Sequence, residues 1–288
     1  MTSAETVHTI QAVRGAVAQA VASGRRVALV PTMGALHDGH LSLVRRASEL
    51  AELVIVSIFV NPLQFGAGED LERYPRTLDA DTTALAVFDD VLVFAPGVDE
   101  MYPSGATSTR ITAGPVGELY EGATRPGHFD GMLTVVAKLF NIVQPDVAVF
   151  GQKDAQQAHL VRQMVSDLNL PLAIEVAPII RGQGGLALSS RNRYLDDAQA
   201  RAALVLSGAL HAAELSAPQG ATKATDAALA AIAAEPGAEL DYFALVHPDT
   251  FLPVDPQHEG AALAIVAARV GSTRLIDNRT LQIAVAQR

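Results

Sequence analysis

Residues 27–50, VALVPTMGALHDGHLSLVRRASEL, combine an apolar run, a short turn and an amphipathic segment. Val27–Val30 is typical of a parallel strand that is buried on both faces, and we expect it to stop at Pro31, which has no N–H to donate. From about Asp38 the apolar residues recur at helical spacing, at Leu41, Val44, Ala47 and Leu50. The stretch therefore predicts a strand, a loop and a helix, in that order.

Two histidines lie where the loop meets the predicted helix. His37 and His40 are three residues apart, so both can face one ligand if His37 joins the first turn. The unpaired N–H groups and the dipole of a helix start favour an anion such as phosphate, and they disfavour imidazolium. We therefore expect neutral rings whose N–H groups donate to phosphate oxygens. A zinc site is one alternative, but the chain has no Cys and no third ligand nearby in sequence; ordinary polar residues at a helix start are another.

The next strand is predicted at Leu53–Val60, and a strand, a helix and a strand in succession imply a right-handed crossover in a parallel sheet. Further strands are predicted at Val91–Phe94, Val147–Phe150 and Ile174–Ile180, with helices over 132–145 and from Asp154 onward. This is the pattern of a Rossmann-like α/β fold. Ligands of such sheets bind beyond the carboxyl ends of the strands, which predicts one shared rim for His37, His40, Asn61 and Gln64.

The composition changes beyond about residue 195. Ala-rich helical segments at 198–215 and 225–234 are followed by short predicted strands at 241–246, 262–268 and 274–277. We therefore expect a Rossmann-like parallel sheet domain over residues 1–183 and a smaller α+β C-terminal domain over 184–288, for which a lid is one hypothesis.

Composition excludes several classes of protein. The net charge of −10 argues against a nucleic-acid partner, and the absence of Cys excludes disulfides and thiolate chemistry. The N-terminus lacks the basic start and apolar stretch of a signal peptide, and we find no clean run of 18 apolar residues, so we expect no membrane partner and a cytoplasmic location. In that compartment the glycosylation sequon at Asn278 would have no meaning.

Two later stretches offer groups that suit a polyphosphate. After the strand at 147–150, Gly151 would let the main chain approach a nucleotide, and Lys153 would lie at the rim of the sheet. Ser189, Ser190 and Arg191 follow a Gly-rich segment and supply hydroxyl and guanidinium donors that suit a leaving pyrophosphate.

These motifs resemble a known family. His-x-Gly-His after a buried strand resembles the adenylyl-transferring superfamily that includes the class I aminoacyl-tRNA synthetases. The longer string PTMGALHDGH resembles the pantothenate synthetase, or pantoate–β-alanine ligase, family, and VNPLQFG, GQKDAQQ and LSSRNRY continue the resemblance in the same order over almost the whole chain. The resemblance implies an ATP-dependent ligase that condenses pantoate with β-alanine through pantoyl adenylate, releasing AMP and pyrophosphate. It also implies a role in coenzyme A biosynthesis, Mg²⁺ as the companion of ATP, and a homodimer.

The resemblance further implies a role for individual residues. It assigns catalysis to His37, His40, Lys153, Ser189, Ser190 and Arg191. It assigns ATP binding to the same residues and to Pro31, Thr32, Met33, Gly34, Ala35, Leu36, Asp38, Gly39, Gly151, Gln152, Asp154, Ile180 and Leu188. It assigns pantoate or β-alanine binding to Met33, Asn61, Gln64 and Gln157, and it puts Asp81 near the magnesium ion of ATP. The family makes His37 a proton donor, whereas the residues themselves support only hydrogen-bond donation.

The chain departs from the family pattern at Gln152 and Ala155, where Glu and Tyr are usual. Two alternatives stay open: a nucleotidyltransferase that activates another small substrate, and a nucleotide sensor without turnover. In the glycine-bearing loop at 118–131, Arg125 and His128 predict either a mobile cover over the site or a solvated turn.

Overall fold

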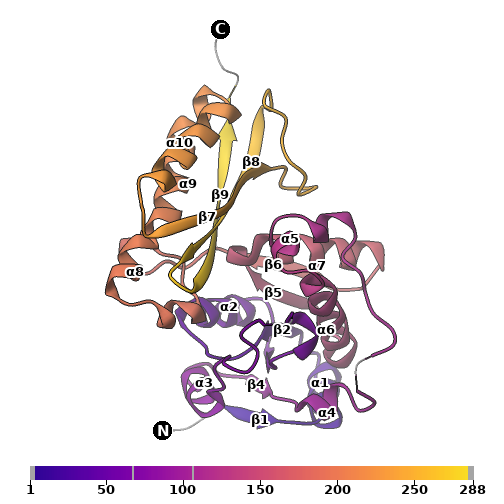
Figure 1. Ribbon diagram of the computed structural model, residues 1–288. Helices are drawn as coiled ribbons and strands as arrows, with labels where there is room; N and C mark the ends of the chain where they lie inside the picture. Colours follow the sequence, from indigo (N-terminus) through magenta and orange to yellow (C-terminus); the bar gives the residue numbers. More distant parts are fainter. Residues whose placement is uncertain (1–3, 67, 106, 285–288) are drawn as a thin grey trace. The chain divides into compact units, whose positions relative to one another are not determined.

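The computed structural model describes residues 4–66, 68–105 and 107–284. The chain divides into two compact units (Figure 1). The first comprises the chain up to Gly151 together with Gln156–Ala177, and the second comprises Gln152–Ala155 and the chain from Pro178 onward. The main division thus falls a few residues before the boundary expected near 183. The short segment 152–155, expected in the first domain, belongs to the second unit, because the polar contacts described below hold it to a C-terminal strand.

The first unit is built on a six-stranded parallel sheet with the strand order β1-β4-β3-β2-β5-β6. Its strands are β1 (Glu5–Val7), β2 (Val27–Thr32), β3 (Leu53–Ile58), β4 (Val91–Phe94), β5 (Val147–Gly151) and β6 (Ala173–Ala177). The predicted Rossmann-like class is confirmed. The edge strand β1, which pairs with β4, was not predicted, since three residues are too few to show a periodic pattern.

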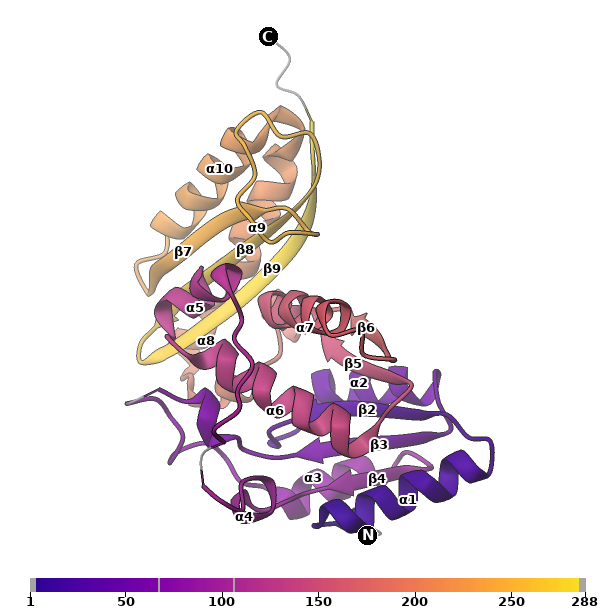
Figure 2. The same ribbon diagram turned by 90° about the vertical axis from the view of Figure 1, so that its right-hand side faces the viewer.

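Helices cover both faces of this sheet, as the continuous apolar strands require. Val27 and Leu29 belong to one buried cluster with side chains of α1 (Ile10–Ala22), α6 (His128–Val143) and α7 (Ala155–Asp167). Ala28 and Val30 point to the other face and join a cluster with α2 (Asp38–Ser48) and α3 (Leu78–Leu85). Figure 2 shows α6 lying along the sheet. The alternation of the strand side chains thus fixes where each helix packs.

Several strand ends of the first sheet differ from the predictions. β2 continues past Pro31 to Thr32, where it pairs with β3 alone, and Pro is tolerated at such one-sided positions. β3 ends at Ile58, two residues before the predicted end at Val60. β6 ends at Ala177 and not at Ile180, because Pro178 has no N–H to continue the ladder.

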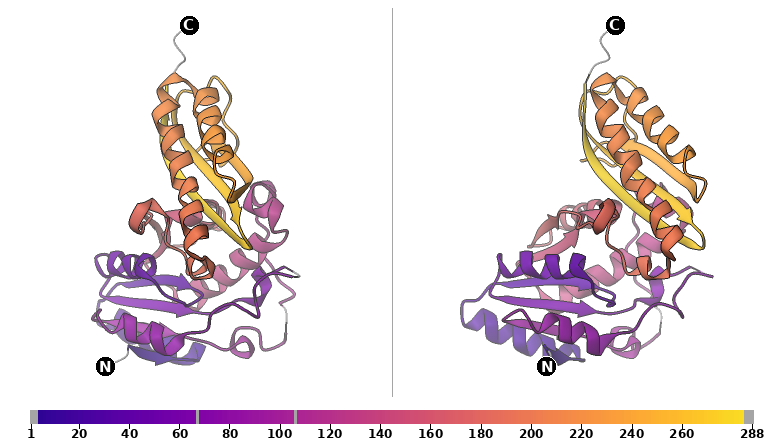
Figure 3. Two further views of the ribbon diagram at one scale, coloured as in Figure 1. Left: turned by 60° about the vertical axis from the view of Figure 1, so that its left-hand side comes forward. Right: turned by 90° about the vertical axis from the view of Figure 1, so that its left-hand side faces the viewer.

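The second unit contains the antiparallel strands β7 (Ala238–Val246), β8 (Gly260–Val270) and β9 (Thr273–Ile283). The helices α9 (Leu204–Ser216) and α10 (Ala221–Ala233) lie against one face of this sheet, as Figure 3 shows, and α8 (Asp197–Ala202) precedes them. Their many Ala side chains, such as Ala209, Ala224 and Ala228, are fully buried and let the helices approach closely. The smaller α+β domain is thereby confirmed, with strands longer than predicted.

Short helices complete the first unit: α4 (Val98–Met101), α5 (Glu121–Thr124) and one-turn 3₁₀ segments at Pro62–Gln64 and Pro115–Glu118. Among the described residues, no helix is both long enough and apolar enough to cross a bilayer.

Candidate active site

The strand order of the first sheet reverses at β2. The chain runs outward from β2 to β3 and β4, whereas β5 pairs with the other side of β2. Ligands of open α/β sheets bind at such a reversal, beyond the carboxyl ends of the strands. The loop after β2 carries Met33 and the two histidines, and the loop after β3 carries Gln64. The two loops touch there, since Gln64 Nε2 donates to Met33 Sδ over 3.1 Å.

The two imidazoles cap the start of α2. His37 Nδ1 accepts a hydrogen bond from the Gly39 N–H at 3.1 Å, and His40 Nδ1 accepts one from the His37 N–H at 3.3 Å. The ring centroids lie 4.1 Å apart. Because each Nδ1 accepts, the proton of each neutral ring is on Nε2. A second proton on either Nδ1 would break that cap, so the caps favour neutral rings that each present an Nε2–H donor.

Asp81 of α3 anchors the loop between β2 and α2. Its side chain is 3% exposed, and its carboxylate accepts from the main-chain N–H groups of Ala35 at 3.0 Å and Leu36 at 2.8 Å. Thr77 Oγ1 donates to the same carboxylate. Ala35 has a φ of 52°, which is strained for a residue with a Cβ, so these bonds hold the loop in a shape that it would not adopt alone. The prediction that Asp81 lies near a magnesium ion remains untested beside this observed role.

A buried network fixes the Gln64 side chain. Asn61 Nδ2 donates to Gln64 Oε1 at 3.2 Å and to the Gly131 carbonyl at 3.1 Å, and Tyr102 donates its hydroxyl to Asn61 Oδ1 at 2.7 Å. Burial raises the pKa of Tyr102 to about 12, so the hydroxyl keeps its proton and remains a donor. The Asn61 carboxamide thus orients Gln64, and both its nitrogen and its oxygen have hydrogen-bond partners within the protein.

The main chain of Gln64 is held from the other side by the loop before α6. His128 is 9% exposed, and its Nδ1 lies 2.8 Å from the Gln64 carbonyl, while its Nε2 lies 3.0 Å from Arg125 Nη1. Arg125 also forms a bidentate ion pair with Glu69, in which Nε and Nη2 donate to the two carboxylate oxygens at 2.9 and 2.6 Å. Because the carbonyl can only accept and the guanidinium can only donate, His128 carries its proton on Nδ1. These contacts anchor the loop, and the buried His128 does not lie in a solvated turn; a mobile cover stays a prediction.

Burial lowers the pKa of His128 to about 4, and the positive charge of Arg125 acts in the same direction. Burial acts to raise the pKa of Glu69, but the hydrogen bonds and charge of Arg125 outweigh it, so the pKa of Glu69 lies below its usual value. A neutral His128 beside a charged Arg125–Glu69 pair is the stable arrangement at neutral pH.

The two glutamines at the start of α7 have different surroundings. Gln156 is buried and donates to the carbonyls of Val116 and Leu119, both at 2.8 Å, so it fastens the segment before α5. Gln157, the predicted pantoate contact, is partly exposed on the helix that follows β5. Because β5 pairs with β2, Gln157 follows the strand that neighbours the one leading to the two histidines.

Gly151 ends β5 in the first unit, whereas the second unit holds the predicted residues 152–154, 180 and 188–191. Lys153 Nζ lies 3.3 Å from Asp154 Oδ2 in the one-turn segment Gln152–Asp154. The chain from Ile180 folds back on itself, with the Leu188 N–H donating to the Ile180 carbonyl at 3.0 Å and a bridge between Arg181 and Ala187. Ser189 Oγ accepts from the Arg191 N–H at 3.3 Å, which caps the short helix Ser190–Tyr194.

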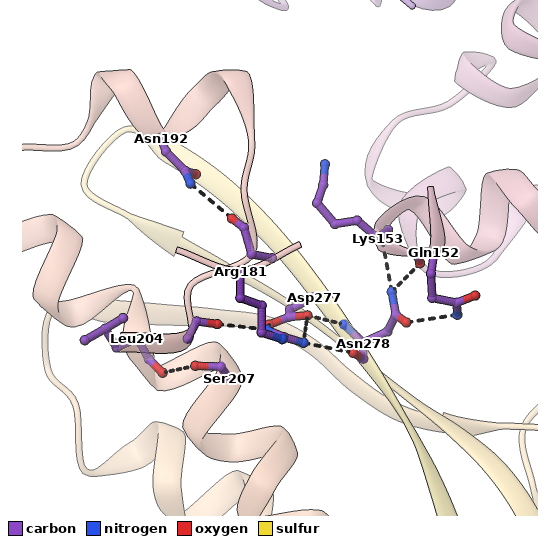
Figure 4. Close-up of polar contacts among 10 residues, drawn as sticks. Gln152, Lys153, Arg181, Asn192, Leu204, Ser207, Asp277 and Asn278 are labelled. Atoms are coloured by element: carbon purple, nitrogen blue, oxygen red, sulfur yellow. Dashed lines mark hydrogen bonds and ion pairs between the residues drawn. The ribbon is translucent and has the colours of Figure 1, made fainter. Parts of the chain in front are cut away.

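Figure 4 shows a polar cluster on β9 that the sequence interpretation missed. Asp277 and Asn278 are each 3% exposed, and they contact Arg181 and the segment Gln152–Lys153, respectively. A pair of polar residues inside an otherwise apolar strand pattern is the signal that could have identified them, since buried polar side chains need partners. Their contacts explain why residues 152–155 belong to the second unit.

No group of three or more His, Asp or Glu residues is arranged to hold a metal ion within the described ranges. The candidate residues are instead hydrogen-bond donors and carboxamides, which suit a phosphate ester and a small hydroxy acid. A magnesium ion at this site would need most of its oxygen ligands from ATP and water, which is how Mg²⁺ is commonly bound beside nucleotides.

Comparisons with known proteins agree with this chemistry. Residues 5–280 match the family model for pantoate-β-alanine ligase. A pantothenate synthetase of Leifsonia xyli subsp. xyli is 60% identical over 262 residues, which cover 91% of either chain. The crystal structure of a pantothenate synthetase from Thermus thermophilus has a TM-score of 0.90 and 48% identity, covering 96% of this chain and 98% of that one. A Francisella tularensis pantoate-β-alanine ligase, solved with β,γ-ATP and β-alanine, has a TM-score of 0.78 and 34% identity, covering 96% and 97%.

Proposed function

Since this chain belongs to the pantoate-β-alanine ligase family and forms pantothenate with the use of ATP, we propose that the residues described above bind the substrates and catalyse the reaction. Family membership and the high identity set aside the two alternatives considered from the sequence, a nucleotidyltransferase for another substrate and a sensor without turnover.

The proposed reaction has two steps. A carboxylate oxygen of pantoate forms a bond to the α-phosphorus of ATP while the bond to the bridging oxygen breaks, which yields pantoyl adenylate and pyrophosphate. The amine of β-alanine then attacks the acyl carbon, AMP leaves, and the nitrogen loses a proton as pantothenate forms. Negative charge builds up on the phosphate oxygens in the first step, so fixed hydrogen-bond donors at those oxygens lower its barrier.

The observation that carries the proposal is the pair of caps at the start of α2. Since both Nδ1 atoms accept main-chain hydrogen bonds, His37 and His40 are oriented as neutral Nε2–H donors beside the N–H groups of a helix start. This geometry supports a role for His37 as a hydrogen-bond donor. It does not support a doubly protonated His37, because its Nδ1 accepts a hydrogen bond.

Lys153, Ser189, Ser190 and Arg191 are proposed to contact the phosphates of ATP, with Ile180 and Leu188 beside its base. The mostly apolar, exposed Ile180 suits the edge of an adenine ring. Pantoate is proposed to bind to Gln64 and Gln157, with Met33 and Asn61 supporting Gln64. A carboxamide offers both a donor and an acceptor, as a hydroxy acid requires.

Mg²⁺ is proposed to accompany ATP, where it would spread the charge of the phosphates. We also propose a homodimer and a cytoplasmic location without nucleic-acid or membrane partners, on the family resemblance and the net charge of −10. Light scattering of the purified protein would test the dimer, since a monomer at all concentrations would contradict it.

Pyrophosphate exchange into ATP in the presence of pantoate tests the first step. His37→Asn keeps a capping acceptor at the start of α2 but removes the Nε2–H, and Lys153→Ala removes the ammonium group. We expect each variant to retain its thermal midpoint and to lose about a hundredfold in exchange rate.

His8→Asn is the matched control, because it changes an exposed histidine whose ring lies 2.7 Å from the Ala95 carbonyl and which follows the edge strand β1, not β2. Exchange at the parent rate in both His37→Asn and Lys153→Ala would remove the proposed roles. The overall ligase activity of each variant is measured separately, as AMP release in the presence of pantoate and β-alanine.

A further inference from the structure

Two neighbouring residues of β9 hold the two segments of the second unit that carry its predicted ATP-binding residues. Asp277 and Asn278 are consecutive, so their side chains leave the strand on opposite faces and can reach different partners. Both side chains are buried, and a buried polar group is costly unless its hydrogen bonds are made. The hydrogen-bond partners of Asp277 and Asn278 therefore show which segments these two side chains hold in place.

Asn278 makes its contacts with the segment Gln152–Lys153. Its Nδ2 donates to the main-chain carbonyl of Gln152 at 2.8 Å and to that of Lys153 at 3.0 Å, while its Oδ1 accepts from Gln152 Nε2 at 3.1 Å. The carboxamide thus uses both of its ends on one short stretch of chain. In Figure 4 the Lys153 side chain extends away from Asn278, which leaves the ammonium group at the far end.

Asp277 holds the other segment. Arg181 Nη1 and Nη2 donate to its two carboxylate oxygens at 2.6 and 2.9 Å, and Arg181 Nη1 also donates to the Gly185 carbonyl at 2.9 Å. Arg181 starts the fold-back that leads through Leu188 to Ser189 and Arg191. The same two residues of β9 therefore fix both the base of Lys153 and the base of the Ser-Ser-Arg stretch.

We propose that Asn278 is a positioning residue for the adenylation step: its carboxamide fixes the main chain at Lys153, so that the ammonium group and the Ser189–Arg191 stretch are carried by one rigid strand. The inference rests on the proposed role of Lys153 and adds a residue that contacts neither substrate. Fixed geometry matters because a displacement of about 1 Å at a reacting group can cost about a hundredfold in rate.

The departure at Gln152 fits this arrangement. Where the family usually has Glu, a carboxylate would face Asn278 Oδ1 without a proton to donate, whereas Gln152 donates from Nε2. The Gln152–Asn278 pair is thus a matched set of amides, and Gln152→Glu should weaken the clamp less than a change at Asn278, because the two carbonyl contacts of Asn278 remain.

The test compares variants in pantoate-dependent pyrophosphate exchange. Asn278→Asp keeps the size and the acceptor but replaces the donor to the two carbonyls with a charged oxygen, and Asn278→Ala removes the clamp. We expect kcat for exchange to fall at least tenfold in both, with KM for pantoate changed less than twofold, because the pantoate contacts lie in the first unit. Gln282→Glu, which adds the same charge at an exposed position of β9, should have no effect.

A double variant separates positioning from general damage. If Asn278 acts through Lys153, then Asn278→Ala adds less than threefold to the loss already caused by Lys153→Ala, because residues that act as one unit are not additive. The inference would be overturned if the double variant lost the product of the two single losses in exchange rate, or if Asn278→Ala exchanged at the parent rate. The proposed role of Lys153 would stand in either case. Full exchange in Lys153→Ala alone would instead overturn the proposed function of that lysine.

Discussion

At the scale of single residues, three histidines of the first unit illustrate how hydrogen-bond partners fix a protonation state. His37, His40 and His128 all use Nδ1 in hydrogen bonds, but the first two accept from main-chain N–H groups, whereas His128 donates to a carbonyl. The same side chain thus has opposite tautomers within one unit. The sequence cannot distinguish them, because the tautomer depends on which group lies opposite each nitrogen.

His128 predicts a dependence of stability on pH. Its pKa of about 4 in the folded protein lies below its ordinary value of 6.5, so the unfolded chain binds the extra proton first. The contribution of His128 to the free energy of unfolding is therefore greatest above pH 6.5 and falls by about 3 kcal/mol as the pH drops toward 4. Urea unfolding of the parent and of His128→Asn, which keeps a donor for the Gln64 carbonyl, measures this. If the free energy of unfolding of His128→Asn fell with pH between 6.5 and 4 as steeply as that of the parent, the lowered pKa of His128 would be refuted.

At the scale of elements, the β2–α2 loop depends on a carboxylate from α3. Asp81→Ala leaves the N–H groups of Ala35 and Leu36 without their acceptor, and we expect a loss of about 2 kcal/mol in the free energy of unfolding, together with weaker ATP binding. Asp79→Ala removes the same charge from a more accessible position of the same helix and should cost much less.

Magnesium separates the two roles considered for Asp81. An anchoring residue stabilises the protein whether or not Mg²⁺ and ATP are present, so thermal midpoints measured without either should fall in Asp81→Ala. An unchanged midpoint, combined with a raised Mg²⁺ requirement for exchange, would favour the metal role.

At the scale of the whole molecule, the two units depend on different interactions. The first is held by a parallel sheet between two apolar clusters, whereas the second combines Ala-rich helices with an ion pair between the buried Asp277 and the partly buried Arg181. We expect Asp277→Ala to cost about 3 kcal/mol of stability, because it leaves a largely buried guanidinium without its carboxylate.

Glu49→Ala is the control for that prediction, since the Arg46–Glu49 pair is exposed and such pairs contribute little to stability. Thermal unfolding followed by circular dichroism measures both variants. Equal midpoints for Asp277→Ala and Glu49→Ala would show that the buried pair adds no more than a surface pair.

The sequence by itself determined the fold class, the strand and helix of residues 27–50 and the family, because apolar periodicity and local motifs are properties of neighbouring residues. It also predicted a common rim for His37 and Gln64, because parallel strands end at one sheet edge. Only the tertiary structure decided the anchoring contacts of Asp81, the proton positions of the histidines and the attachment of Gln152–Lys153 to Asn278. Those partners are far apart in sequence, and a hydrogen bond between distant residues leaves no periodic trace in the chain.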